Sequence, residues 1–511
     1  MTTTARPKTI SKLRAFLGSR RFFAVIMAVF LIEAIWLALS GRYPMAFDED
    51  FHLGIIRLYA HHLSPFWSGQ PSGADSFGAV ARDPSYLYQY LMSFPYRLVT
   101  LFTHSQTVVV MVLRGISIAL FAASLPLYHR LMLKTGASRA LVQSCLALFV
   151  LIPIVPLLAA QINYDNLLLP LVALALLLTA DIARELRATQ RLNTKRLLVL
   201  VILSLLASLV KYAFLPILLA IAAYLAVCCW RAYPTWRKFW LSLGFGFTLM
   251  SRRLRWLLVV LTLLSIGLFV QRYGVNVVRY HTPIPDCGQV LSTQRCDAYG
   301  PWRRDHNTML HKDPNATKSP LVYAADWFYG MWLRTFFAVD GPYTHFQTRG
   351  PFVVPSMAAI GFAGVGLLAA IGYSRRILRK YNRQVLWLFV GTVVSYAGVL
   401  WLDGYHSFLR IGVANAINGR YLLPILPLLL VMCGLGWGQL LRRRPQFKMA
   451  AIGLALLCMI WGGGALTYIL RSNDAWYWPW TPLKSADHVL QDGLGPLTPG
   501  YHDPGAFMGR N

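Results

Sequence analysis

The stretch FFAVIMAVFLIEAIWLALS, residues Phe22 to Ser40, is followed closely by AFDEDFH, residues Ala46 to His52. The first is apolar apart from Glu33 and is long enough to cross a hydrocarbon core of ~30 Å. The second places three consecutive carboxylates, Asp48–Asp50, directly beyond that span. Such a cluster is unusual in a chain with only 20 Asp and Glu among 511 residues. It is either a solvated loop that caps the next helix or a functional cluster at a membrane surface.

The composition is that of a membrane protein. Hydrophobic residues make up 56% of the chain, charged residues 14%, and the mean hydropathy is +0.48, whereas soluble domains carry roughly 25% charge. Because the apolar residues come in blocks of span length, we expect an all-α polytopic fold with about eleven transmembrane helices. The net charge of +29 is scattered over short loops, with no basic domain, which argues against a nucleic-acid partner.

The order of apolar and polar blocks predicts three parts. Residues 1–21 form an N-terminal segment, residues 22–470 a transmembrane domain with long loops at 41–105 and 272–350, and residues 471–511 a polar tail. Apolar spacing from Phe51 onward predicts a surface helix inside the first loop. The expected spans are Phe22–Ser40, Gln106–Tyr128, Ala140–Ala160, Leu167–Ala180, Leu197–Val210, 213–230, Trp256–Gln271, Pro351–Tyr373, Val385–Leu402, Tyr421–Leu441 and Met449–Leu470.

The distribution of charge predicts the orientation in the cell membrane. With the N-terminus in the cytoplasm, most Lys and Arg fall on short cytoplasmic segments, as the positive-inside rule requires. All acids except Glu33, Asp181 and Glu185 then fall on the other side or its boundary. An odd number of spans places both long loops and the C-terminal tail outside the cytoplasm.

Polar groups that could carry chemistry gather at this outer face. Three of them have two interpretations each. Asp165 caps a span or serves a site, Lys211 reaches the head groups or makes a specific contact, and Arg420 is an interfacial anchor or a ligand-binding cation. Ionisable groups near membrane depth are costly and are usually functional. The set is Asp48, Glu49, Asp50, His52, Asp165, Lys211 and Arg420.

The seven cysteines divide into two groups. Five lie in apolar runs, where a cysteine is most simply a small buried hydrophobe. Cys287 and Cys296 lie together in the second long polar loop, and an oxidising compartment would join them in a disulfide. We expect that bond to order the loop and not to take part in chemistry.

Three short motifs resemble the GT-C superfamily of membrane glycosyltransferases, in particular a group of bacterial GT-C-like membrane proteins. They are Asp48–His52 after the first span, Asn163–Asp165 after the third, and Gly419–Pro427, a Gly-Arg-Tyr sequence followed by spaced prolines. Phe47 departs from that pattern, where a proline is common. Asp50 departs as well, because a third acid blurs which carboxylate matters. Each motif is short, and it is the ordered set that carries the resemblance.

The resemblance implies transfer of a sugar from a polyprenyl-phosphate donor to a cell-envelope glycan, lipid or protein acceptor. Such chemistry needs a carboxylate as base and cations for the leaving phosphate. We expect Asp48 to be the principal catalytic carboxylate, with Glu49 next. Because helical spacing begins near Phe51, Asp50 would be a structural N-cap. The expected substrate-binding residues are His52, Asp165, Lys211, Arg420 and Tyr421. The acidic cluster can also hold Mg²⁺ or Mn²⁺, and the superfamily has members with and without a metal.

Two other functions fit a polytopic chain with intramembrane charges. One is a transporter or flippase of lipid-linked saccharide, although internal repeats typical of transporters are not evident in the sequence. The other is a polymerase or ligase of surface glycan. An outward-facing site would favour the transferase, whereas a central cavity open to both sides would favour transport.

Overall fold

The structure is a computed structural model that describes residues 8–45, 48–314, 316–336, 353–414, 417–462, 469, 472, 474–479 and 481–494. Within these ranges every regular element is a helix, which confirms the all-α fold class. The end of the second long loop, residues 337–352, and the tail after Leu494 lie outside the described residues, as do Ala46 and Phe47.

The elements follow the apolar blocks of the sequence. The first half contains α1 (Lys8–Leu17), α2 (Arg20–Ser40), α3 (Glu49–Ala60), η1 (Asp75–Phe77), α4 (Leu87–Thr100), α5 (Gln106–Leu133), α6 (Arg139–Leu151), α7 (Ile154–Ala159), α8 (Asp165–Thr189), α9 (Thr194–Val210), η2 (Tyr212–Phe214), α10 (Leu215–Ala232) and α11 (Trp236–Thr248). The second half contains α12 (Arg252–Phe269), η3 (Val270–Gly274), α13 (Val275–Tyr280), α14 (Cys287–Val290), α15 (Thr293–Cys296), α16 (Gly300–Leu310), α17 (Pro320–Phe336), α18 (Val353–Gly372), α19 (Ser374–Lys380), α20 (Arg383–Ile411), η5 (Gly419–Leu422), α21 (Leu426–Leu440), α22 (Pro445–Gly462), η6 (Asp474–Trp476) and α24 (Leu483–Leu494).

Six of the described helices are long and apolar enough to cross a membrane, or seven if the bent pair α18 and α19 counts as one span. The chain is therefore an integral membrane protein. Three further apolar helices, Arg139–Leu151, Leu426–Leu440 and Gln446–Ile460, are shorter. Most of the expected spans overlap these helices, but Leu197–Val210 is not among them, and residues 463–468 and 470 of the last expected span lie outside the described residues. The count of eleven stays a prediction.

One expected span is interrupted. The block Ala140–Ala160 contains two prolines, and the helix α6 ends at Leu151, before α7 begins at Ile154. Proline removes a backbone donor and disfavours helical geometry in the residue before it, so a break at Pro153 is the expected physical result. The break brings the end of α7, and the turn into α8, to the level where the polar groups gather.

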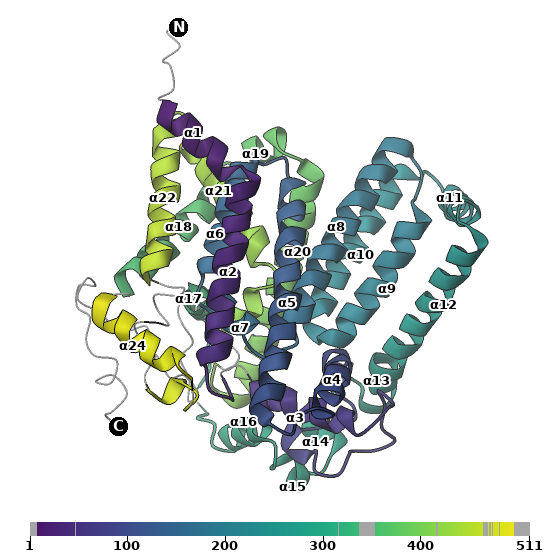
Figure 1. Ribbon diagram of the computed structural model, residues 1–511. Coiled ribbons are helices and arrows are strands. Elements are labelled where there is room, and N and C mark those ends of the chain that lie inside the picture. Colours follow the sequence, from purple (N-terminus) through teal and green to yellow (C-terminus); the bar gives the residue numbers. More distant parts are fainter. Residues whose placement is uncertain are drawn as a thin grey trace.

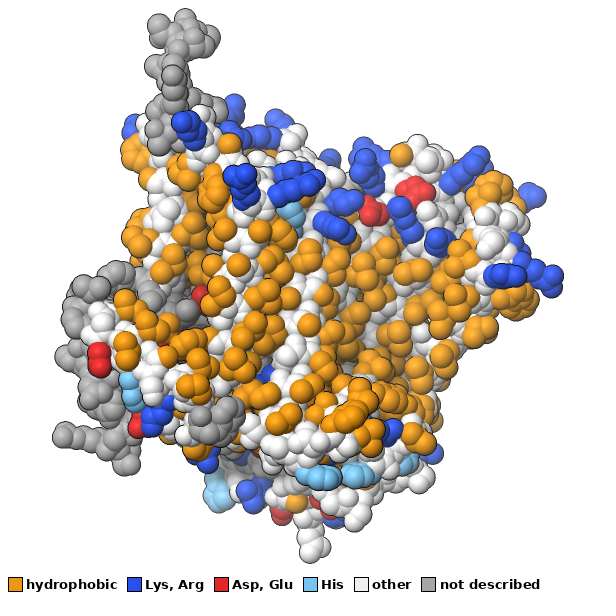
Figure 2. All heavy atoms as spheres, viewed as in Figure 1, with side chains coloured by type: hydrophobic (Ala, Val, Ile, Leu, Met, Phe, Trp, Pro, Cys, Tyr) orange, Lys and Arg blue, Asp and Glu red, His pale blue; other side chains and the backbone are white. Residues whose placement is uncertain are grey.

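The helices stand side by side, with α5 packed along α8, α10 along α20 and α18 along α21 (Figure 1). At the end of the molecule away from the N-terminus lie α3, α4 and the short helices α14, α15 and α16. Figure 2 shows Lys and Arg side chains gathered at the opposite end, with a broad hydrophobic band between. This arrangement agrees with the charge asymmetry that the sequence predicts.

The helix after the carboxylates begins earlier than we expected. It starts at Glu49, and its N-cap position is Asp48, whose side chain makes no capping bond. Asp50 lies in the first turn and is exposed. The assignment of Asp50 as the N-cap is therefore wrong, because buried contacts of Glu49 extend the helix by two residues beyond its apolar periodicity.

Candidate functional site

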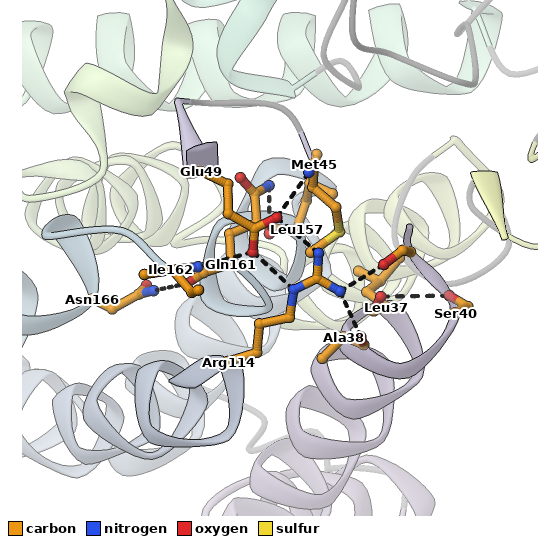
Figure 3. A network of polar contacts seen from close by, with 11 residues as sticks. Leu37, Ala38, Ser40, Met45, Glu49, Arg114, Leu157, Gln161, Ile162 and Asn166 are labelled. Atoms are coloured by element: carbon orange, nitrogen blue, oxygen red, sulfur yellow. Dashed lines mark hydrogen bonds and ion pairs between the residues drawn. The ribbon is translucent and has the colours of Figure 1, made fainter. Parts of the chain in front are cut away.

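The foundation of the site is a buried ion pair between Glu49 and Arg114 (Figure 3). Both side chains are fully buried, and the guanidinium donates from Nε to Glu49 Oε1 and from Nη2 to Oε2, each at 2.8 Å. Two backbone amides also donate to the carboxylate, those of Met45 at 2.8 Å and Ile162 at 3.2 Å. Such a bidentate, fully hydrogen-bonded pair is what makes a buried charge tolerable.

The remaining donor of Arg114 extends the network to the end of α2. Its Nη1 donates to the carbonyls of Ala38 at 2.8 Å and Gly41 at 2.6 Å. The Arg114 guanidinium thus joins α2, α3 and α5, while Ile162 brings in the turn after α7. The position of α3, and with it that of Asp48, is set by this network.

The C-terminal part of the chain covers the same network. Residues after the last apolar helix return to the end of α2, where Trp476 Nε1 donates to Ser40 Oγ at 3.1 Å and the Arg42 amide donates to the Trp476 carbonyl at 2.7 Å. The ring of Trp478 lies 5.8 Å from the Arg114 guanidinium carbon. The described part of the tail therefore lies at the end of the molecule that carries the acidic cluster.

Asp48 has an unusual backbone and an exposed side chain. Its φ of 67° and ψ of 31° lie in the left-handed region, which costs a non-glycine residue about 1–3 kcal/mol and often marks functional sites. Its side chain is 56% exposed, and its Oδ2 accepts from Arg420 Nη2 at 2.7 Å. Burial raises the pKa of Asp48, but the charge and hydrogen bond of Arg420, with a smaller effect from Lys211, hold that pKa below its ordinary value.

Arg420 reaches this position because Gly419 approaches another helix closely. A Cβ at Gly419 would lie 2.3 Å from the amide nitrogen of Thr335 and 2.4 Å from the carbonyl carbon of Arg334, both in the backbone of α17. Only glycine permits that approach. The structure therefore explains why the motif contains glycine before arginine: the close contact of Gly419 with α17 sets the position of Arg420.

Lys211 and Asp165 form a second buried ion pair, close to Asp48 and Arg420. Lys211 Nζ lies 2.7 Å from Asp165 Oδ1, and the side chains are 5% and 3% exposed. The ammonium also lies 4.4 Å from the ring centre of Tyr164 and 5.5 Å from that of Tyr421, distances at which an aromatic face stabilises a cation. Of the two interpretations of Lys211, the structure therefore supports a specific contact within the protein and not an extension toward the lipid head groups.

His52 lies one turn into α3 and is buried among these groups. Burial is the main cause that lowers the pKa of His52; Asp48 opposes it, Arg420 and Lys211 add to it, and the net pKa is about 3. The imidazole is thus neutral at physiological pH. With the Gln89 amide oxygen toward the ring, His52 Nδ1 donates to it at 3.2 Å, and the amide nitrogen donates to the Ser85 carbonyl at 2.9 Å. That tautomer leaves Nε2 with its lone pair.

The structure brings six of the predicted residues together and separates two. Asp50 is exposed and outside the polar contacts described above, and Glu49 belongs to the buried network with Arg114. The residues that share the site, through direct contacts or through the charge interactions around His52, are Asp48, His52, Asp165, Lys211, Arg420 and Tyr421.

The disulfide lies over the same end of the molecule. Cys287 and Cys296 are joined, with 5.8 Å between their Cα atoms. Arg295, next to Cys296, forms an ion pair with Asp75 at 2.7 Å. The ring of Tyr299, three residues after Cys296, lies 6.1 Å from that of Phe51 on α3. The disulfide-linked loop therefore packs against the helix that carries the acidic cluster.

Two residues that contribute to the site, Arg114 and Gln89, received no role in the sequence-based prediction. Arg114 was visible as a charge inside an apolar span, and such a residue signals a buried partner, but nothing local names Glu49 as that partner. Gln89 carries no signal at all, because a lone glutamine in an aromatic segment has no diagnostic spacing. Within the described ranges, no three His, Cys, Asp or Glu side chains lie close enough to hold one metal ion together.

Comparison with known proteins finds similarity to solved structures. No protein-family model matches the sequence, and neither does a curated protein. The backbone is similar to the crystal structure of ArnT from Cupriavidus metallidurans in the apo state, a GT-C glycosyltransferase, with a TM-score of 0.44 and 13% sequence identity. The match covers 85% of this chain and 63% of that one, so this chain spans less than two thirds of ArnT.

Proposed function

We propose that the protein is a GT-C-type glycosyltransferase that transfers a sugar from a polyprenyl-phosphate donor to a cell-envelope acceptor at the outer membrane face. The observation that carries this proposal is the contact of Asp48 with Arg420. It pairs an exposed carboxylate with a cation at the end of an apolar helical bundle, where a lipid-linked substrate and a polar acceptor can meet. The similarity of the motifs to the superfamily supports the same reaction.

Arg420 and Lys211 are the groups suited to the donor phosphate. The planar guanidinium of Arg420 can bind phosphate through two parallel hydrogen bonds, and Lys211, held by Asp165 and two tyrosine rings, adds a second positive charge. Negative charge grows on the phosphate oxygen as the sugar leaves, so two fixed cations lower the barrier. In this proposal Asp165 positions Lys211, and Tyr421 lines the site between the two cations.

Asp48 is the proposed base. It takes the proton of the acceptor hydroxyl or amine while the acceptor atom bonds to the anomeric carbon, and the bond from that carbon to the phosphate oxygen breaks. Without donor, Arg420 holds the carboxylate and lowers its basicity. A phosphate that binds Arg420 would release Asp48 and raise its pKa, which couples activation of the base to the arrival of the donor.

Glu49 has a different role in this proposal. Its two oxygens already accept four hydrogen bonds from buried donors, so it is a poor base and a strong anchor. We therefore revise the sequence-based prediction that placed Glu49 second in catalysis. Its function is to hold α3, and through it Asp48, against α5.

The direct test measures binding of sugar-free polyprenyl phosphate to the purified protein in phosphatidylcholine nanodiscs. Arg420→Gln should weaken binding, whereas Arg410→Gln, which removes an exposed cation paired with Asp286, should not. Cells lacking the gene should accumulate a lipid-linked sugar and lose a surface modification. Unchanged binding in Arg420→Gln would refute the donor site.

A separate experiment tests the transporter alternative. If protein in vesicles moves lipid-linked saccharide between leaflets without consuming it, the chain is a transporter.

A further inference from the structure

A cavity lies at the opposite end of the molecule from the acidic cluster. It has a volume of about 900 Å³ and is lined mainly by residues of α1, α6, α18, α21 and α22, which lie beside one another in Figure 1. Its walls are mainly apolar, with the stacked rings of Phe362 and Trp437, 4.3 Å apart, on one side. We refer to it as the inner groove.

The mouth of the inner groove is basic. Arg14, Lys380, Arg442 and Lys448 line it, and none of the described residues that line it is acidic. Arg442 follows the end of α21, whereas Arg14 belongs to α1 and Lys380 ends α19, so the cations come from separate elements. This end is the one at which Lys and Arg gather in Figure 2, and the positive-inside rule makes it the cytoplasmic end.

The inner groove also has the depth of one membrane leaflet. Along α21 it extends from Arg442 to Leu430, which at 1.5 Å per residue is about 18 Å. Half of a hydrocarbon core of ~30 Å is roughly 15 Å. A free anion would need the basic mouth alone, whereas an apolar channel of this length below the mouth matches an acyl chain.

We propose that the inner groove binds an anionic phospholipid of the cytoplasmic leaflet, with its head group at the basic mouth and an acyl chain along α21. Basic pockets between transmembrane helices on the cytoplasmic side bind such head groups in other proteins. This inference is independent of the proposed transferase site, because the two lie at opposite ends of the molecule and share no residue.

The first experiment fills the inner groove. A Cβ on Gly438, which lines it, would meet no atom within 4 Å, so the side chain of Gly438→Leu begins in open space and adds bulk at the groove. The matched control is Gly453→Leu on α22, where a Cβ also meets nothing within 4 Å and which does not line the groove. Native mass spectrometry of the full chain in detergent, titrated with phosphatidylglycerol, should show weaker binding for Gly438→Leu alone.

The second experiment removes the charge. The triple variant Arg14→Gln, Lys380→Gln, Arg442→Gln should weaken phosphatidylglycerol binding on the order of 100-fold, because each cation near an anionic lipid contributes roughly fivefold. The triple control Arg237→Gln, Lys238→Gln, Arg253→Gln removes exposed cations from α11 and α12 and should bind as the unmodified chain does. Melting temperatures establish that each variant folds.

Three outcomes would overturn the proposal. The first is equal affinity for phosphatidylglycerol and phosphatidylcholine, and the second is equal affinity in the charge variant and its control. The third is full competition by millimolar inorganic phosphate, which would make the mouth a site for a free anion. If Gly438→Leu does not fold, the charge variants still decide the question.

Discussion

At the scale of single residues, Asp48 and Asp50 are both exposed but differ in backbone and contacts. Asp48 has a left-handed backbone and contacts Arg420, whereas Asp50 lies in the first turn of α3, outside the polar contacts of the site. Loss of a general base costs ~10²–10⁴-fold in rate, so we expect a loss of that size for Asp48→Asn and near-normal turnover for Asp50→Asn. Single-turnover rates at saturating donor test this. An inactive Asp50→Asn beside an active Asp48→Asn would reverse the assignment.

The pH dependence of the reaction should report the same contact. In the free enzyme Arg420 lowers the pKa of Asp48, so the carboxylate stays ionised at pH values where an ordinary aspartate has gained a proton. Activity that needs the ionised base should therefore be lost, as pH falls, only below the usual aspartate range. In Arg420→Gln the effect of burial is no longer offset by the cation, and the acidic limb of kcat/KM should move to higher pH.

An acidic limb that stays in place in Arg420→Gln would show that Asp48 is not the titrating base. His52 should add no limb between pH 5 and 8, because burial lowers its pKa to about 3. A matched profile of Arg410→Gln controls for the general loss of one positive charge at this face.

Substitution of Glu49 tests whether this residue has a structural or a catalytic role. Glu49→Gln leaves Arg114 buried without its counter-ion, and the loss of one partner of such a pair typically costs ~3–5 kcal/mol. We expect a lower melting temperature in detergent for this variant. The double variant Glu49→Leu, Arg114→Leu removes the unpaired charge but leaves the Met45 and Ile162 amides without their acceptor, so it should recover only part of the loss. If Glu49→Gln instead melts normally and is inactive, Glu49 is catalytic, as the sequence alone predicted.

At the scale of elements, the close approach of η5 to α17 positions Arg420, the cation that we propose binds the donor phosphate. Gly419→Ala would force a Cβ into the backbone of α17, so η5 must move and Arg420 with it. A displacement of about 1 Å in a positioning group can cost 10²-fold in rate. We expect weaker donor binding and slower turnover, while Gly391→Ala on α20, where a Cβ meets nothing within 4 Å, should leave both unchanged. Normal donor affinity in Gly419→Ala would exclude this role of the glycine.

At the scale of the whole molecule, the two ends carry different chemistry. The acidic cluster, the disulfide-linked loop and the described part of the tail lie at one end, and the inner groove with its basic mouth lies at the other. We predict that the first end is extracytoplasmic. A reporter that is active only in the cytoplasm, fused after Arg510, should be silent, and the same reporter fused before Lys8 should be active. Activity at the C-terminal fusion would invert the topology and both site assignments.

The sequence by itself determined the class of protein, because hydropathy and charge asymmetry are local properties that a bilayer reads directly. It also indicated Cys287 and Cys296 as a pair, since nine residues of separation allow only a small loop. Only the tertiary structure decided the roles within Asp48–Asp50. Glu49 meets Arg114 across 65 residues, and Asp48 meets Arg420 across 372. Pairings over such distances depend on how helices pack, and no local spacing in the chain encodes them.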